Sequence, residues 1–297
     1  MKLQEYAGNM KKVDIHLHLT LKQYPKNKTI FVSSAENMIS HLEALGIEKG
    51  ILMSSGEKSS INLFISNYEC KEISEKFNDK YAWMCNLDFK NEESIYHRLK
   101  LYKEQGAVGI GEFMINRKLS DSFIQKVFES AQDLELPILF HMSPKEGYQY
   151  GVVDEPGLPM LEWCLKKYPK LKFIGHSQPF WHEITKNPGQ SIEERMTWGK
   201  GKVTYGGKIP YLFEKYINLY GDLSANSGGA AIMRDEEFGL NFLKKYNDRL
   251  LFGTDMINNE MEFPLGKWLD KKYKEGLLDK VTYENICSKN AVKLFKL

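Results

Sequence analysis

Short apolar runs alternate with longer amphipathic segments along the chain, a pattern typical of repeated βα units around a parallel sheet. Between the runs, segments such as Ala35–Leu45 and Asp121–Leu134 repeat apolar residues at helical intervals. Eight runs have the length and composition of buried strands. They are Lys12–Leu19, Gly50–Ser54, Tyr81–Leu87, Ala107–Phe113, Ile138–Met142, Phe173–Ser177, Leu219–Ser224 and Leu250–Asp255. The pattern predicts an α/β protein with a (β/α)8 TIM barrel fold.

The connection between the sixth and seventh predicted strands is longer than a crossover helix needs. It runs from Gln178 to Tyr211 and contains prolines, glycines, Trp181, Trp198 and Arg195. A connection of this length is commonly functional, and it would stand at the strand ends where barrel active sites form. The alternative is a surface insertion without function, because loops accept insertions freely. At 297 residues the chain has the usual size of one barrel, and we predict a single domain over 1–297.

Composition and charge narrow the classes of partner. Lys and Arg total 41 and Asp and Glu total 39, so the formal net charge is +2. This balance disfavours nucleic acid as a partner, because proteins that bind it usually carry a concentrated basic face. The sequence contains no apolar run long enough to cross a bilayer, and its first residues lack the apolar stretch of a signal peptide. We therefore expect a cytoplasmic protein.

The cysteines do not indicate a metal knuckle or a redox pair. All four are widely separated along the chain, at Cys70, Cys85, Cys164 and Cys287. Zinc knuckles and redox dithiols need closely spaced pairs. We expect these residues to be reduced and mostly buried thiols.

His16 and His18 give the strongest local chemical signal. They stand two positions apart in the first predicted strand, so both side chains point to one face while their apolar neighbours point to the other. Two neutral imidazoles at this spacing suit a borderline divalent ion such as Zn²⁺. The alternative is that the two rings bond only to each other or to water.

Three further metal-competent residues end predicted strands. His141 and His176 lie at the C-terminal ends of the fifth and sixth apolar runs, and Asp255 closes the eighth. Barrel active sites consist of polar residues at the ends of several strands, whereas the remaining histidines fall in predicted helices or loops. Asp255 is placed to bind the ion or to take a proton from its water.

Glu112 lies near the end of the fourth predicted strand, between glycine-rich sequence and Phe113. Its carboxylate has three candidate roles: to bridge two metals, to accept a substrate proton, or to support one of the histidines from behind. The sequence leaves all three open.

Six segments occur in an order and a strand placement that together identify a family. They are Asp14-Ile15-His16-Leu17-His18, His141, Ile174-Gly175-His176, Gly221-Asp222-Leu223-Ser224, Phe252-Gly253-Thr254-Asp255 and Asn290-Ala291-Val292-Lys293-Leu294-Phe295. The chain resembles the amidohydrolase superfamily over nearly its whole length. Within it, the chain is most similar to the amidohydrolase-related group that includes aminocarboxymuconate semialdehyde decarboxylase.

The resemblance implies a metal site with assigned roles. His16, His18 and His141 would ligate a divalent metal, and Asp255 would be both a ligand and a proton shuttle. His176 would orient or polarise the attacking water or the substrate. Other branches of the superfamily hold two metals with a carboxylate comparable to Glu112, so one ion is favoured and two are the alternative. Zn²⁺ is expected, with Mn²⁺ as the second choice.

The implied activity is that of a metal-dependent hydrolase, which uses a metal-activated water on a small, anionic lactone, amide or ester. Trp181, Arg195 and Arg234 are candidate substrate-binding residues because they lie in rim segments. The alternatives are that the arginines are surface charges and that Trp181 anchors the insertion. One alternative is nonoxidative decarboxylation of an unsaturated or aromatic carboxylic acid. Another is a catalytically inactive metal-binding barrel. Because barrels of this kind commonly form dimers, a homodimer is one expected assembly.

Overall fold

The computed structural model describes residues 11–23, 31–57, 65–89 and 94–297, and its strands form a closed parallel barrel. The barrel strands are β1 (Lys12–Leu17), β2 (Ile47–Leu52), β3 (Tyr81–Trp83), β4 (Ile110–Phe113), β5 (Ile138–Ser143), β7 (Phe173–His176), β8 (Leu219–Asp222) and β9 (Leu250–Leu251). One sheet has the order β1-β2-β3 and the other β4-β5-β7-β8-β9. Parallel bridges close both seams, from Cys85 to Ile110 and from Leu17 to Met256. The predicted (β/α)8 TIM barrel is confirmed.

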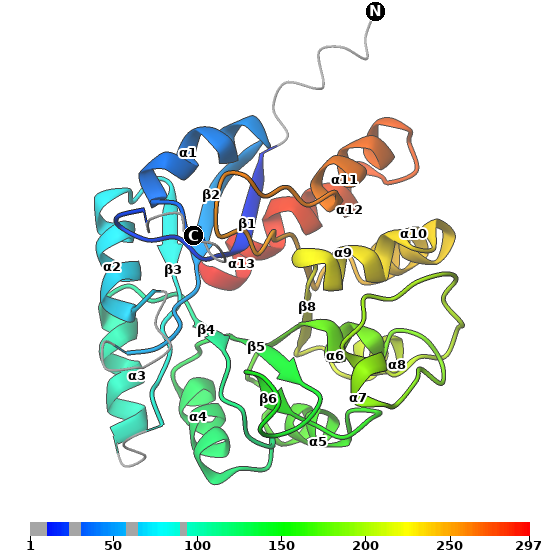
Figure 1. Cartoon of the computed structure of the whole chain (residues 1–297), viewed down its shortest axis with the longest axis horizontal. Coiled ribbons are helices and arrows are strands. Elements are labelled where there is room, and N and C mark those ends of the chain that lie inside the picture. Colours follow the sequence, from blue (N-terminus) through cyan, green and yellow to red (C-terminus); the bar gives the residue numbers. More distant parts are fainter. Residues whose placement is uncertain (1–10, 24–30, 58–64, 90–93) are drawn as a thin grey trace, which may run out of the picture.

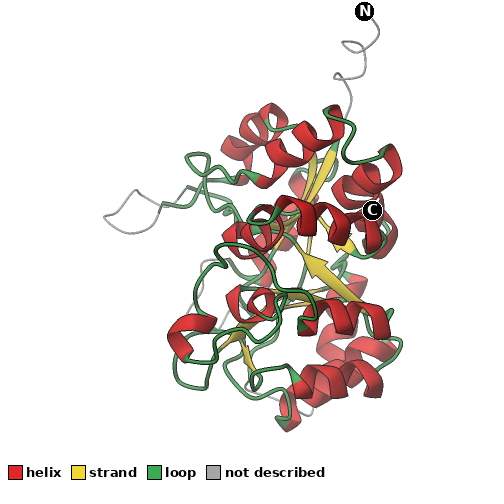
Figure 2. Cartoon of the chain, turned by 90° about the vertical axis from the view of Figure 1, so that its right-hand side faces the viewer, coloured by secondary structure: helices red, strands yellow, loops and turns green. Residues whose placement is uncertain are grey.

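Helices surround the strands, most of them in an outer ring (Figure 1), and the turned view keeps the strands inside this ring (Figure 2). They are α1 (Ala35–Ala44), α2 (Asn67–Lys76), α3 (Ile95–Glu104), α4 (Ser122–Asp133), α5 (Pro159–Lys167), α6 (Gln178–His182), α7 (Ile192–Arg195), α8 (Lys208–Lys215), α9 (Ala225–Met233), α10 (Glu236–Lys245), α11 (Leu265–Lys274), α12 (Lys280–Glu284) and α13 (Asn290–Phe295), with a π-helical turn at Asn285–Lys289. Side-chain caps fix several helix starts. The Asp121 carboxylate, for example, accepts the backbone N–H of Phe123 at 2.9 Å and begins α4.

Strand pairing ends earlier than the apolar runs predicted. The third run was predicted to Leu87 but β3 ends at Trp83, and the eighth was predicted to Asp255 but β9 ends at Leu251. Most residues beyond these ends are buried, but their pairing is reduced to isolated contacts such as the bridge from Cys85 to Ile110. Apolar character reports burial rather than pairing, so the runs overestimated strand length.

Two features of the connections matter for the site. A short strand, β6 (Val152–Val153), pairs in parallel with the end of β5, and the sequence pattern did not predict it. The predicted excursion after β7 is present: it holds α6 and α7 and leads into α8. Both segments lie at the C-terminal ends of the strands.

The barrel interior is packed with apolar side chains rather than open. One buried cluster gathers residues from strands around the barrel, Val13, Ile15, Ile51, Met53, Met84, Leu139, Ile174 and Leu251, together with Ala291 and Phe295 of α13. This packing leaves the polar groups at one end of the barrel, as its architecture requires. The four cysteines are free and buried, as expected. Within the described residues, no helix combines the length and apolarity needed to cross a bilayer.

Candidate metal centre

Four donor atoms from β1, β4 and the segments beyond β1 and β9 converge at the mouth of the barrel. His16 Nε2 lies 3.1 Å from His18 Nε2, 3.6 Å from Glu112 Oε2 and 3.4 Å from Asp255 Oδ1. His18 Nε2 lies 3.5 Å from the same Glu112 oxygen and 3.3 Å from the same Asp255 oxygen. Ligands about 2.1 Å from a tetrahedral ion stand about 3.4 Å apart. The group of His16, His18 and Asp255 therefore fits a zinc-sized ion in both chemistry and spacing, and Glu112 Oε2 lies beside both imidazoles.

Asp14 holds the end of β1 against the segment that carries Asp255. Its buried carboxylate accepts the backbone N–H of His16 at 3.0 Å, and it accepts the N–H and hydroxyl of Thr254 at 3.0 and 2.6 Å. Burial raises the pKa of Asp14 to about 7, although the hydrogen bonds from Thr254 and His16 lower it. The backbone N–H of Asp255 also donates to the carbonyl of His16 at 2.8 Å. These bonds fix the relative position of two predicted ligands.

Glu112 lies between two groups of histidines and presents one oxygen to each. Its Oε2 faces His16 and His18, whereas its Oε1 lies 2.6 Å from His141 Nδ1 and 3.7 Å from His176 Nε2. The structure therefore does not bring His141 into the group formed by His16, His18 and Asp255. Glu112, His141 and His176 form a second group of potential ligands.

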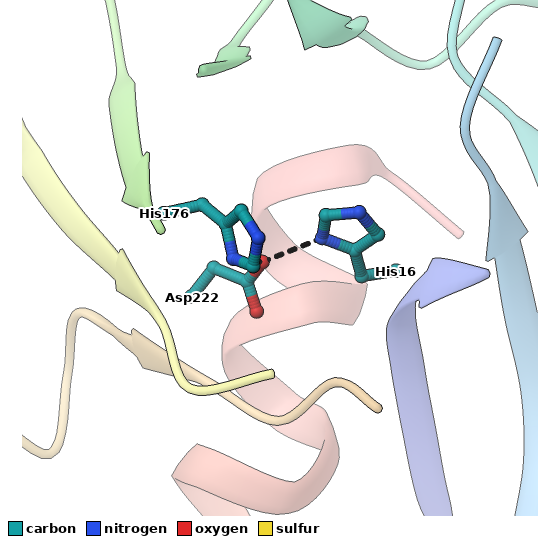
Figure 3. Close-up of side chains that lie close together, drawn as sticks. All are labelled: His16, His176 and Asp222. Atoms are coloured by element: carbon teal, nitrogen blue, oxygen red, sulfur yellow. Dashed lines mark hydrogen bonds and ion pairs between the residues drawn. The ribbon is translucent and has the colours of Figure 1, made fainter. Parts of the chain in front are cut away.

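One carboxylate orients both His16 and His176 (Figure 3). Asp222 Oδ2 lies 2.7 Å from His16 Nδ1 and 3.0 Å from His176 Nδ1, and it accepts the Ser224 hydroxyl at 2.8 Å. The Nδ1 atoms of both rings face Asp222, so both Nε2 atoms are directed toward the metal centre. Burial raises the pKa of Asp222, but the charge of His176 and the hydrogen bond of His16 outweigh burial and lower it.

The cluster of carboxylates gives the centre a need for positive charge. Burial lowers the pKa of His16, but the charge of Asp255 and the hydrogen bond to Asp222 raise it well above its ordinary value. Burial raises the pKa of Glu112, but the charge and hydrogen bond of His141 hold it well below its ordinary value. Without a metal, protons on the imidazoles offset the negative charge of the carboxylates. A divalent cation would offset the same charge by replacing these protons.

A cavity of about 1210 Å³ opens above the centre. His18, Glu112, His141 and Asp255 all line it. Its other lining residues include the aromatic side chains Phe89, Tyr148 and Tyr150, which are 41%, 42% and 55% exposed. The site thus joins a polar floor to a partly aromatic wall, an arrangement typical of small-molecule sites.

The three predicted substrate-binding residues are not among the described residues that line this cavity. Trp181 is 2% exposed, and its indole N–H donates to the backbone carbonyl of Asp222 at 2.9 Å. It packs behind the residue that orients His16 and His176. Burial of its large apolar ring in the core is more favourable than exposure of the ring to water at the rim of the cavity.

Arg195 and Arg234 bond to backbone carbonyls instead of facing the cavity. Arg195 donates to Pro144 O at 3.1 Å and to Asp154 O at 3.0 Å. Arg234 donates to Lys200 O at 3.2 Å. A guanidinium offers five donors and often serves as a structural link between loops, which sequence position alone does not reveal.

Sequence reasoning assigned no role to several residues of the site. Asp222 and Ser224 end a predicted strand, which is the same signal that singled out His176. The sequence alone cannot distinguish a carboxylate that orients a histidine from one that binds the metal. Asp14 carried only a motif match. Tyr148 and Tyr150 lie in a segment without regular pattern, and no sequence signal pointed to them.

Solved structures share the fold over almost the whole chain. A 2,6-dihydroxybenzoate decarboxylase from Rhizobium is 15% identical with a TM-score of 0.60, covering 97% of this chain and 99% of that one. A probable 2-pyrone-4,6-dicarboxylic acid hydrolase from Acinetobacter baumannii is 15% identical with a TM-score of 0.56, covering 96% and 99%. A dihydroxybenzoic acid decarboxylase from a Polaromonas species, with bound manganese, is 17% identical with a TM-score of 0.57, covering 97% of each chain. At these identities the likeness concerns the fold.

Comparison by sequence gives the family. No curated protein sequence matches the chain significantly. A family model described as amidohydrolase matches residues 81–297, which is well over half of the chain. This match confirms the resemblance inferred from the strand-end motifs, and the chain belongs to the amidohydrolase family.

Proposed function

We propose that the protein is a metal-dependent hydrolase that holds one divalent ion between His16, His18, Glu112 and Asp255. The observation that carries this proposal is the approach of the donor atoms: the Nε2 atoms of His16 and His18 lie 3.1 to 3.6 Å from each other and from the Glu112 and Asp255 oxygens. Two imidazole nitrogens and two carboxylate oxygens suit Zn²⁺, and Mn²⁺ is the second choice. In this proposal Glu112 replaces the predicted ligand His141.

The bound ion would supply Lewis acidity, which eases the removal of a proton from water and withdraws electron density from a substrate carbonyl. Asp255 faces the cavity, with 28% of its side chain exposed. Burial raises its pKa, but the charge of His16 and the hydrogen bond of His18 lower it, so its carboxylate is ionised at neutral pH. Asp255 can accept the proton of the attacking water and return it to the leaving group.

His176 is the second group that acts on the substrate in this proposal. Its Nδ1 is held by Asp222, and its Nε2 lies 3.7 Å from Glu112 and 3.8 Å from Asp255. From this position it can stabilise negative charge that develops on a substrate oxygen. We propose a small lactone, amide or ester as substrate, without the anion recognition by Arg195 and Arg234 that the sequence suggested.

Metal analysis and a hydrolysis panel test the proposal. Purified protein should contain about one zinc or manganese per chain, and the metal-loaded form should hydrolyse at least one class among lactones, amides and esters. Chelation should abolish the activity, and return of the metal should restore it. A chain that holds no ion and gains no thermal stability from added Zn²⁺ or Mn²⁺ would favour an inactive barrel.

Decarboxylation is a second candidate function. The three exposed aromatic residues of the cavity, Phe89, Tyr148 and Tyr150, suit a planar unsaturated substrate. The structurally similar dihydroxybenzoate decarboxylases favour the same reading. Product analysis separates the two: release of CO2 from an aromatic or unsaturated acid supports decarboxylation, whereas a carbon-balanced pair of products or a ring-opened acid supports hydrolysis.

A second ion is the alternative stoichiometry. Glu112 Oε1, His141 and His176 form a group of potential ligands beside the first site. Two bound ions per chain, reduced to one by His141→Asn, would favour a bridging role for Glu112. One ion per chain in both proteins supports the single site proposed above.

A further inference from the structure

A loop over residues 144–151 forms one wall of the cavity. It connects β5 to β6, and its residues Tyr148, Gln149 and Tyr150 line the cavity. The ring centroid of Tyr150 lies 4.6 Å from that of His141. The shape of the cavity on the His141 side therefore depends on where this loop lies.

Arg195 binds the first residue of this loop and the residue that follows β6. Its guanidinium donates from Nη1 to Pro144 O at 3.1 Å and from Nη2 to Asp154 O at 3.0 Å. Pro144 follows β5 directly and Asp154 follows β6 directly. Because the donors of a guanidinium stand in a rigid planar fork, two carbonyls bound by one Arg keep a fixed separation.

The burial of Arg195 indicates that these contacts matter. Arg195 is 3% exposed, and among the described residues its Nε has no hydrogen-bond partner. The nearby carboxylate of Asp154 is already occupied by backbone N–H groups, those of Glu155, Met160 and Leu161. A buried charge is costly unless its hydrogen bonds offset its desolvation, and here the carbonyls of Pro144 and Asp154 are the acceptors.

The opposite side of the loop is held by a different residue. Asn116, which follows β4, accepts the backbone N–H of Gly147 at 2.6 Å and donates to Gly151 O at 3.0 Å. Arg195 comes from α7, in the excursion that follows β7 and its last residue, His176. The loop is therefore anchored to the segments after both neighbouring strands.

We propose that Arg195 is a positioning residue, which holds the tyrosine-bearing loop against His141 and so sets the cavity wall that the substrate meets. The structural part of this inference concerns the loop alone, and only its link to the substrate rests on the proposed function. It also assigns a role to the long excursion after β7: part of that segment braces the active-site wall from behind.

Loop mobility in the zinc-loaded protein tests the proposal. Trypsin cleavage after Lys145, an exposed residue within the loop, and hydrogen exchange of the amides of residues 145–151 both report loop opening. In Arg195→Met both rates should rise at least about tenfold, with zinc content unchanged. Arg195→Lys keeps the charge and can reach one carbonyl, so it should restore part of the protection.

Arg234→Met is the matched control. Arg234 also has a buried Nε without a partner among the described residues, but its hydrogen bond goes to Lys200 O, away from the loop. In Arg234→Met, the rates of trypsin cleavage and of hydrogen exchange in the loop should stay within about twofold of wild type. Unchanged loop rates in Arg195→Met, or a rise spread evenly over the barrel strands, would overturn the proposal. If Arg195→Met does not fold, wild-type loop rates in Arg195→Lys would overturn the proposal instead. Absence of zinc from the wild type would contradict the proposed function and leave the loop comparison valid.

Discussion

Asp222 Oδ2 lies 2.7 Å from Nδ1 of His16, on the side of the ring away from the metal centre. With a metal bound, the proton of His16 would reside on Nδ1, and Nε2 would be free to ligate. The same oxygen lies 3.0 Å from Nδ1 of His176. One buried carboxylate therefore orients both a candidate ligand and the candidate catalytic histidine.

Asp222→Asn should weaken metal binding. The amide can still accept one hydrogen bond, but it loses the charge that favours the Nδ1 protons of two rings, and such outer contacts are worth about 10-fold to 100-fold in metal affinity. Competition with a chromophoric zinc chelator measures the change. The same substitution at the exposed Asp248 is the control. Equal zinc affinities in all three proteins would contradict the role of Asp222.

His176→Asn should separate catalysis from metal binding. His176 is not one of the four proposed metal ligands, so the zinc content of the variant should stay near that of the wild type. The loss of its stabilising contact with the substrate should lower kcat by about 100-fold to 10,000-fold. Zinc analysis and steady-state kinetics on the same preparation measure both. A parallel loss of metal would show that His176 is a ligand.

The metal-free protein should lose stability as the pH rises above 6.5. The pKa values of His16 and His18 are raised above their ordinary value of 6.5 because nearby carboxylates outweigh burial. A raised pKa means that the folded chain holds these protons more tightly, so their stabilisation is complete below 6.5 and lost through the folded values. Burial lowers the pKa of His141. The contribution of His141 to stability therefore changes below pH 6.5, and it rises with pH where that of His16 and His18 falls.

Thermal unfolding with and without zinc checks this prediction. The Tm of the chelated protein should fall between about pH 6.5 and pH 8.5, and the stabilisation by zinc should grow over the same range, because the ion competes with these protons. His18→Asn should reduce the pH dependence. A zinc effect of the same size at both pH values would rule out this competition.

Thr254→Val should destabilise the protein by about 1–3 kcal/mol, because it leaves the buried Asp14 carboxylate without a hydroxyl donor. The hydrogen bond at risk is 2.6 Å long and joins the end of β1 to the segment before Asp255. Thr197→Val, at an exposed position whose hydroxyl donates to the carbonyl of Glu194, is the control. Urea unfolding of the zinc-loaded proteins gives both values. Equal midpoints would remove Asp14 and Thr254 from the account of the site.

Gly175→Ala should be poorly tolerated beside His176. A Cβ at Gly175 would stand 2.2 Å from two ring atoms of Phe180, which is fully buried. Overpacking of this kind costs about 1–3 kcal/mol. At Gly266 in α11 the nearest atoms would lie 3.4 Å away, so Gly266→Ala should be neutral or stabilising. Thermal unfolding compares the two, and a Gly175→Ala protein as stable as wild type would refute the packing argument.

The sequence by itself determined the fold and the side chains that carry the chemistry. Eight apolar runs separated by amphipathic segments specify a barrel, because each element must bury one face against its neighbours. The period of a strand places His16 and His18 on one side, and the architecture places His141, His176 and Asp255 at the same end of the barrel. These inferences need only local pattern and a general rule of topology.

Only the tertiary structure decided which atoms meet. His16 contacts Asp222 across 206 positions, and His141 contacts Glu112 across 29, so neither pair leaves a local signal. The sequence could not show that Glu112 presents one oxygen to His16 and His18 and the other to His141, or that Arg195 donates to the carbonyls of Pro144 and Asp154. Such choices depend on side-chain reach and on competition between acceptors in a packed interior, and these are settled only when all the strands are in place.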